Sequence, residues 1–287
     1  MYPSSVQSSL PVETLELIFE HLAYNDLATV VRGNSVFHKI ATRLLYRSIT
    51  GLALQPKRSL ILVSTLARND LYAFFVRHID LDWSENILTG NFLRLLHRAL
   101  KRLKSLTQLN LEFSPIDNGT NFTWVLEECT FQLKSLTTSL RCDAVLARFL
   151  ERQTNLTELC LRGYSPLTAF SLSEHALPRL THLRTVFSCP RTTADFIRGR
   201  PVEIVSMSLY PRDAASSLDA LLLSSRTVKR LTVMSFEIAQ PDTLLNEVAI
   251  RLPNLEALHA VILMTHFTHV SPRSRVTLRR DWKGGGK

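Results

Sequence analysis

Two leucine-rich stretches decide the fold: residues 103–111, LKSLTQLNL, and residues 155–161, NLTELCL. In each stretch leucines are spaced three residues apart and then two apart. The final alternation, Leu109 with Leu111 and Leu159 with Leu161, is typical of a short strand with one apolar face. Weaker copies begin at Leu177, Val228 and Leu252, and partial copies centre on residues 79–81, 133–136 and 202–207. The chain is therefore read as a series of similar units.

These copies recur at comparable intervals along the chain. The positions taken as equivalent are separated by 30, 50, 24, 22, 26 and 27 residues, and they are Ile79, Leu109, Leu159, Leu183, Val205, Leu231 and Leu258. The interval of 50 would hold two units if residues 133–140 supply a further strand. The other intervals lie in or near the range of leucine-rich repeats, about 20–29 residues.

Amphipathic stretches lie between the expected strands. The clearest is residues 91–103, NFLRLLHRALKRL, and others are residues 143–150, 193–198, 214–223 and 243–252. Strands that alternate with helices favour a parallel sheet. The sequence thus predicts an α/β fold, an irregular leucine-rich-repeat solenoid with parallel strands and outer helices over residues 76–265. A generic α/β domain, whose leucines only fill its core, is the alternative. Residues 181–194 and 206–214 fit the repeat poorly.

A different pattern occupies residues 10–49, LPVETLELIFEHLAYNDLATVVRGNSVFHKIATRLLYRSI. Leu15, Ile18, Phe19 and Leu22 lie on one stripe of a helix, and Pro11 suits its first position. Two more short helices are expected before residue 49. Their apolar faces are too large for so short a segment to bury alone, so these three helices are expected to need a partner.

The residue order of this segment resembles an F-box, the module that joins a substrate receptor to a Skp-type adaptor of a cullin–RING ubiquitin ligase. The matching residues are Leu10, Pro11, Glu13, Leu15, Ile18, Phe19, Leu22, Asp26, Leu27 and the run Phe37–Ala41, with an ending at 44–49 similar to that of fungal members. The chain departs from the family at Tyr46, where many members have tryptophan, and at residues 31–36. The resemblance covers about 40 of the 287 residues.

The resemblance implies a non-enzymatic receptor with two binding surfaces. Adaptor binding would use Leu10, Pro11, Leu15, Ile18, Phe19, Leu22 and Leu27. The repeat region would hold a protein substrate of unknown identity near the ubiquitin-loaded enzyme. The alternative is a leucine-rich scaffold, with no ligase role, whose N-terminal helices only cap the solenoid.

Outward positions of the expected strands indicate where a substrate would bind. The candidates are Asp80, Asp82, Asn110, Glu112, Arg162, Arg184 and Arg230. The early units contribute acids and the later units contribute bases. We therefore expect a surface with opposite charges at its two ends, although any solvated strand face carries polar side chains.

The remaining segments complete the expected organisation. Residues 1–9 are expected to be flexible, residues 50–75 to form a helical linker or cap, and residues 266–287 to be a basic, disordered tail. The net charge is +9, and between residues 273 and 287 six bases accompany one acid. The body is thus only mildly basic, and a nucleic-acid partner is not expected because no nucleic-acid-binding motif is present.

No enzymatic, metal or membrane signal accompanies these patterns. The phosphate-binding, nucleophile-elbow and zinc-protease motifs are missing. His259, His266 and His269 have no cysteine or carboxylate at ligand spacing, so neither a metal site nor a cofactor is predicted. Four scattered cysteines fit free thiols in the cytoplasm or nucleus. The longest apolar runs are too short to cross a membrane.

Overall fold

The centre of the fold is a parallel sheet whose strands lie in sequence order. The computed structural model describes residues 10–50, 56–85, 89–114, 122–163, 170–186, 189–210, 212–236 and 241–263. Within these ranges nine strands pair in the order β1 to β9. They are β1 (Ser48–Ile49), β2 (His78–Trp83), β3 (Gln108–Phe113), β4 (Ser135–Thr138), β5 (Glu158–Leu161), β6 (His182–Thr185), β7 (Ile204–Leu209), β8 (Arg230–Phe236) and β9 (Ala257–Leu263).

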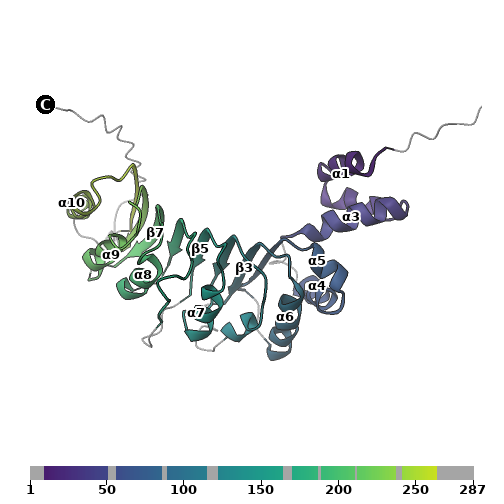
Figure 1. Ribbon diagram of the computed structural model, residues 1–287, viewed down its shortest axis with the longest axis horizontal. Coiled ribbons are helices and arrows are strands. Elements are labelled where there is room, and N and C mark those ends of the chain that lie inside the picture. Colours follow the sequence, from purple (N-terminus) through teal and green to yellow (C-terminus); the bar gives the residue numbers. More distant parts are fainter. Residues whose placement is uncertain are drawn as a thin grey trace, which may run out of the picture.

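Helices cover one side of this sheet (Figure 1). The helices are α1 (Val12–Glu20), α2 (Tyr24–Val30), α3 (Ser35–Arg47), α4 (Pro56–Arg68), α5 (Asp70–Phe75), α6 (Gly90–Arg102), the short 3-10 helix η2 (Thr123–Leu126), α7 (Ala144–Glu151), α8 (Pro190–Ile197), α9 (Ala214–Leu221) and α10 (Pro241–Arg251). The whole forms an arc, with α4 to α9 along its outer side and α1 and α3 at one end. The predicted α/β class with parallel strands is confirmed, and the arrangement is compatible with a solenoid.

The strand register aligns the positions that the sequence analysis took as equivalent. Each expected position pairs with the next one across the sheet, and β4 places Leu136 between Leu109 and Leu159. The expected extra strand at residues 133–140 is therefore present. All of these side chains except that of Leu258 are buried. This register puts one apolar residue of every unit at the same depth of the core.

The backbone is tied from unit to unit at the start of each strand. The carbonyl oxygen of Arg77 accepts hydrogen bonds from two successive amides of the next unit, those of Thr107 and Gln108. The same paired bonds recur at the carbonyls of Thr107, Lys134, Thr157, Thr181, Glu203 and Lys229. Because buried backbone amides and carbonyls need hydrogen-bond partners, these paired bonds satisfy the backbone of the turn before each strand. They recur even in units where the leucine pattern is weak.

Side-chain caps begin several of the helices. Asn34 accepts a hydrogen bond from the Phe37 amide at 2.8 Å, and Asp143 accepts from two amides of the first turn of α7. Such caps satisfy amides that have no partner within the helix. The predicted helices begin and end within three residues of the observed ones. The largest difference is at α8, which starts at Pro190 instead of 193 because a proline suits the first turn.

Two hydrophobic cores are separate. The larger core runs from Ile49 to Leu252 between the sheet and its outer helices. The smaller core, around Phe19, Leu27, Ile40 and Ala41, belongs to α1, α2 and α3. We call these helices the three-helix unit, residues 12–47. The predicted segments 1–9 and 266–287, together with His266 and His269, lie outside the described residues.

Gly163 follows β5 at a point where two backbones touch, and we expect Gly163→Ala to destabilise the protein. An added Cβ would lie 2.1 Å from the carbonyl oxygen of Leu140 and 2.5 Å from that of Ser139. The two chain segments must then separate, which costs about 3 kcal/mol. Gly90→Ala is the control, because a Cβ there meets nothing within 4 Å. The free energy of unfolding from urea denaturation checks this; equal values for the two variants would contradict it.

Candidate interaction surfaces

The three-helix unit has an interior of its own. The rings of Phe19 and Phe37 meet edge to face with centroids 5.2 Å apart. Two ion pairs join α1 to α3 at the surface, Glu16 with Arg43 and Glu20 with Arg47. Exposed pairs of this kind contribute little, so burial of the apolar side chains stabilises the unit.

The predicted adaptor-binding residues divide into two groups. Phe19 and Leu27 are only 5% and 6% exposed, and Leu15 and Leu22 pack against the same core. Phe19 and Leu27 are therefore core residues of the unit, and Leu15 and Leu22 are half-buried against that core. Leu10, Pro11 and Ile18 are exposed. An apolar stripe in a sequence does not separate side chains that face the core of the unit from those beside it, and only the packing of the helices makes this division.

An exposed apolar surface remains on α1. Leu17 is 61% exposed, Ile18 46% and Leu10 54%. Leu10 and Pro11 directly precede the first helical residue, Val12, and Leu17 and Ile18 lie in the second half of α1. We call Leu10, Pro11, Leu17 and Ile18 the α1 apolar strip. Leu17 was not predicted, because it lies beside the stripe of Leu15, Ile18, Phe19 and Leu22 on which the sequence analysis relied.

The three-helix unit is joined firmly to the sheet. Helix α3 leads directly into β1, which pairs with β2, and Ile49 is buried in the larger core. The ring of Tyr46 stacks on that of Tyr72 in α5, with centroids 4.5 Å apart and planes 14° from parallel. The Tyr24 hydroxyl also lies 2.6 Å from the carbonyl oxygens of Leu45 and Ser48. The unit therefore has a defined orientation relative to the arc.

The second candidate surface is the sheet face turned away from the outer helices, which we call the inner sheet face. Asp80, Asn110 and Arg184 occupy one row across the strands, because Asp80 pairs with Asn110 and Cys160 with Arg184. Asp82 and Glu112 pair in the next row along the strands. Arg230 lies in the row before that of Asp80, where it pairs with Ile204. Strands about 4.8 Å apart place Asp80 and Arg184 roughly 20 Å apart along the sheet.

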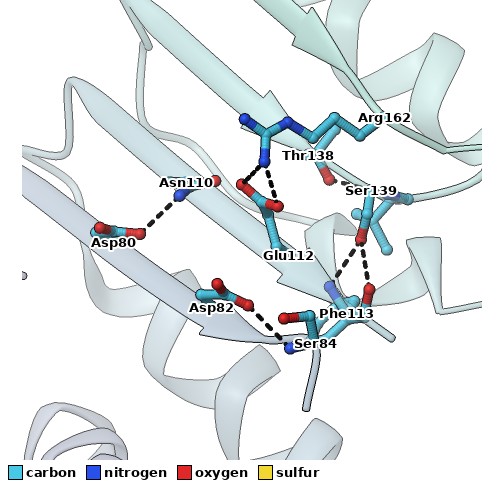
Figure 2. A network of polar contacts seen from close by, with 10 residues as sticks. Asp80, Asp82, Ser84, Asn110, Glu112, Phe113, Thr138, Ser139 and Arg162 are labelled. Atoms are coloured by element: carbon cyan, nitrogen blue, oxygen red, sulfur yellow. Dashed lines mark hydrogen bonds and ion pairs between the residues drawn. The ribbon is translucent and has the colours of Figure 1, made fainter. Parts of the chain in front are cut away.

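Polar contacts organise the acidic end of this face (Figure 2). Asn110 donates its side-chain amide to Asp80 at 2.6 Å, and the Ser84 amide donates to Asp82 at 2.9 Å. Arg162 reaches across β4 and donates to both carboxylate oxygens of Glu112, at 2.7 and 2.6 Å. Burial alone would lower the pKa of Arg162, but the Glu112 carboxylate outweighs it and raises that pKa.

This network changes the expected charge pattern. The Glu112 side chain is 14% exposed and that of Arg162 40%, so the carboxylate of this pair is shielded while the guanidinium stays partly in contact with water. The sequence analysis counted Arg162 among the bases of the later units, but its charge is paired with that of Glu112 at the acidic end. Arg184 and Arg230 are exposed and remain at the basic end. A charge difference persists, from Asp80 and Asp82 at one end to these two arginines at the other.

All four cysteines are free, and they differ in environment. Burial raises the pKa of Cys129 and of Cys142 to about 12. Burial would also raise the pKa of the exposed Cys189, but hydrogen bonds from Thr192 and from nearby amides outweigh it and lower the pKa. Because the thiolate is the reactive form of cysteine, Cys189 should react faster than Cys129 and Cys142 in the folded protein.

We therefore expect a soluble disulfide reagent at mildly alkaline pH to modify Cys189 first. Cys129 and Cys142 should react only after unfolding, since they are both buried and protonated. Mass spectrometry of peptides from timed samples measures this order. Labelling of Cys142 as fast as Cys189 in the folded protein would be inconsistent with the structure.

The described residues hold no group of three or more histidine, cysteine or acidic side chains suited to a metal ion. In the same residues no helix is long and apolar enough to span a membrane. Comparison with models of known protein families gives no match, and a search of curated proteins finds no relative. The fold and the surfaces define an α/β protein with a parallel sheet in sequence order and a separate three-helix unit at one end.

Proposed function

We propose that this chain is the substrate-recognition subunit of an SCF-type cullin–RING ubiquitin ligase. The three-helix unit would be an F-box that binds a Skp-type adaptor, and the arc would be an irregular leucine-rich-repeat region that binds a protein substrate. The observation that carries the proposal is the α1 apolar strip. It lies on a unit with its own core, and the chain there has the residue order that resembles an F-box.

The α1 apolar strip indicates that this unit has a binding partner, because its side chains stay exposed and are not buried in either of the two hydrophobic cores. Of the thirteen large apolar side chains that are exposed in the described residues, Leu10, Leu17 and Ile18 are three, and Val12, Tyr24 and Val36 lie on the same unit. An apolar surface concentrated in this way is typical of an interaction site. Leu10, Pro11 and Ile18 would bind the adaptor directly, together with Leu17. Leu15, Phe19, Leu22 and Leu27 would maintain the shape of the unit.

The mechanism would be proximity, with no chemistry by this chain. Tethering both the ligase and a substrate raises the effective concentration of substrate lysines near the loaded enzyme. The stacked pair Tyr46–Tyr72 and the pairing of β1 with β2 suit this role, because a firm junction holds the substrate at a defined distance. Such a ligase acts in the cytoplasm or nucleus, and the four free cysteines are compatible with those compartments.

On the inner sheet face, the proposal assigns substrate binding to Asp80, Asp82, Asn110, Arg184 and Arg230. A substrate with basic groups near β2 and acidic groups near β6 and β8 would complement this face. Arg162 and Glu112 would instead hold the middle of the sheet in shape. A charge-reversal test of substrate binding should accordingly use Arg184 and Arg230 and leave Arg162 unchanged.

The alternative is a scaffold without a ligase role, and one observation favours it. Because β1 continues α3 and pairs with β2, the three-helix unit also covers the first edge of the sheet. A cap of this kind would account for the unit without an adaptor. The α1 apolar strip distinguishes the two functions, because a cap has no need of an exposed apolar surface on its far helix.

Co-purification of the full chain with a recombinant Skp-type adaptor tests the proposal. We expect a stoichiometric complex in size-exclusion chromatography. A folded protein that forms no complex would instead support the scaffold. Deletion of residues 1–49 is unsuitable as a control, because it would remove β1 and expose the edge of β2. Point substitutions in the α1 apolar strip are the better control, and their expected effect is given in the Discussion.

A further inference from the structure

Residues of α4, α5 and α6, with Lys104 just after α6, line an open groove. These three helices lie on the outer side of the arc (Figure 1). The volume of the groove is about 630 Å³, and it is lined by Ala67, Asp70, Phe74, Arg98, Lys101, Arg102 and Lys104. We call it the α4–α6 groove. Neither the α1 apolar strip nor the inner sheet face contributes a residue to it.

Positive charge dominates the α4–α6 groove, with four bases and one acid in its lining. Arg102 donates to Asp70 at 2.6 Å, and Lys101 pairs with Glu128 of the next unit. Arg98 and Lys104 are exposed and have no ion pair among the described residues. Two cations are thus available at the groove.

Like charges lie next to one another along α6. Arg94, Arg98 and Arg102 follow one another at intervals of four residues along α6, so like charges are neighbours on one helix face. Pairs of this kind destabilise a helix. Since α6 buries its other face through Phe92, Leu96 and similar side chains, its packing does not require these bases. An anionic partner would offset the repulsion.

The groove also offers an apolar contact. Phe74 is 55% exposed, and Leu71, one turn earlier in α5, is 59% exposed. The guanidinium of Arg77 lies 5.9 Å from the centroid of the Phe74 ring. A partner that fits this groove therefore combines negative charge with a large apolar side chain.

We propose that the α4–α6 groove binds an acidic peptide segment of a partner protein, with carboxylates at Arg98 and Lys104 and one apolar side chain against Phe74. The chemistry favours a peptide over a nucleic acid. Single-stranded nucleic acids use successive aromatic platforms, whereas Phe74 is the one aromatic residue in this lining. This inference does not depend on the proposed ligase function.

Fluorescence polarisation of a labelled synthetic peptide tests the proposal. The peptide carries Asp–Glu pairs on either side of a central leucine, and the protein is the full chain. We expect saturable binding that weakens as salt is raised, because the contacts are between exposed charges. A peptide with Asn and Gln in place of the acids should not bind, and one with serine in place of the leucine should bind more weakly. Absence of saturable binding to the acidic peptide would overturn the proposal.

Substitutions of groove residues test whether the peptide binds at the α4–α6 groove. Arg98→Gln with Lys104→Gln should weaken binding about tenfold, as should Phe74→Ala. The matched control is Arg191→Gln with Arg212→Gln, which removes the same charge from exposed positions near α8 and α9 and should leave the affinity within about twofold. Equal losses in the control would mean non-specific attraction and overturn the proposal. The proposal would also be overturned if an oligonucleotide bound more tightly than the peptide and lost affinity in the same groove variants.

Discussion

Arg200→Met should lower the free energy of unfolding by about 4 kcal/mol, the largest stability effect we expect from a single substitution. The Arg200 side chain is 1% exposed and has no ion pair with a carboxylate among the described residues. Its guanidinium instead donates to four backbone carbonyls. Nε reaches Ala176 at 2.8 Å, Nη2 reaches Ser173 at 2.8 Å, and Nη1 reaches Asp195 at 2.6 Å and Arg198 at 3.0 Å.

These bonds join the segment before β6 to the end of α8. Methionine fills similar space but removes the donor from the carbonyls of Ala176, Asp195 and Arg198, whereas that of Ser173 also accepts from the Ala176 amide. Each buried group left unpaired costs about 1–3 kcal/mol. Lysine should rescue little, because its compact ammonium group lacks the planar fork that spans the four acceptors. Burial lowers the pKa of Arg200, and the nearby carboxylates of Asp195 and Glu174 oppose this by favouring its charged form.

Arg198→Met is the matched control for this substitution. Arg198 is exposed two residues earlier and loses the same charge, but its side chain is not part of the cluster. We expect a change below about 0.5 kcal/mol. Urea denaturation followed by circular dichroism measures both variants. If Arg200→Met were as stable as Arg198→Met, the buried guanidinium would not support this part of the arc.

The second large effect concerns the α1 apolar strip. Leu17→Asp with Ile18→Asp should weaken binding to a Skp-type adaptor on the order of a hundredfold or more, because two carboxylates would have to be buried at the interface. Since both side chains are exposed, the unit itself should stay folded. Titration calorimetry with the recombinant adaptor measures the loss, and circular dichroism checks the fold.

The control for this pair is Leu222→Asp with Ile250→Asp. These residues are 55% and 73% exposed near the other end of the arc, so the change in charge and polarity is the same. Adaptor binding should be unaffected. Phe19→Asp is unsuitable, because a buried charge there would unfold the three-helix unit and remove binding for an unrelated reason. Unaltered adaptor binding by Leu17→Asp with Ile18→Asp would exclude the α1 apolar strip as the interface.

Local sequence patterns were sufficient to predict the strands and helices of the sheet region and their order along the chain. The spacing of leucines predicted the α/β class, the parallel strands and the aligned positions from Ile79 to Leu258, and it anticipated the strand around Leu136. These features depend on which side chains recur at a given interval, and such intervals are visible without knowledge of distant contacts. The F-box resemblance and the repeat family stay predictions, since no protein family matches the chain.

Long-range contacts decided the rest. Arg200 was not predicted as a core residue because arginine is seldom buried and its acceptors are backbone atoms from two separate segments. The pair Glu112–Arg162 joins side chains 50 residues apart, and this removed Arg162 from the basic end of the inner sheet face. The division of the predicted adaptor residues into buried Phe19 and exposed Ile18 likewise required the packing of α3 against α1. Periodicity specifies which face of an element is apolar, whereas only the folded chain determines which part of that face is covered and which charges meet.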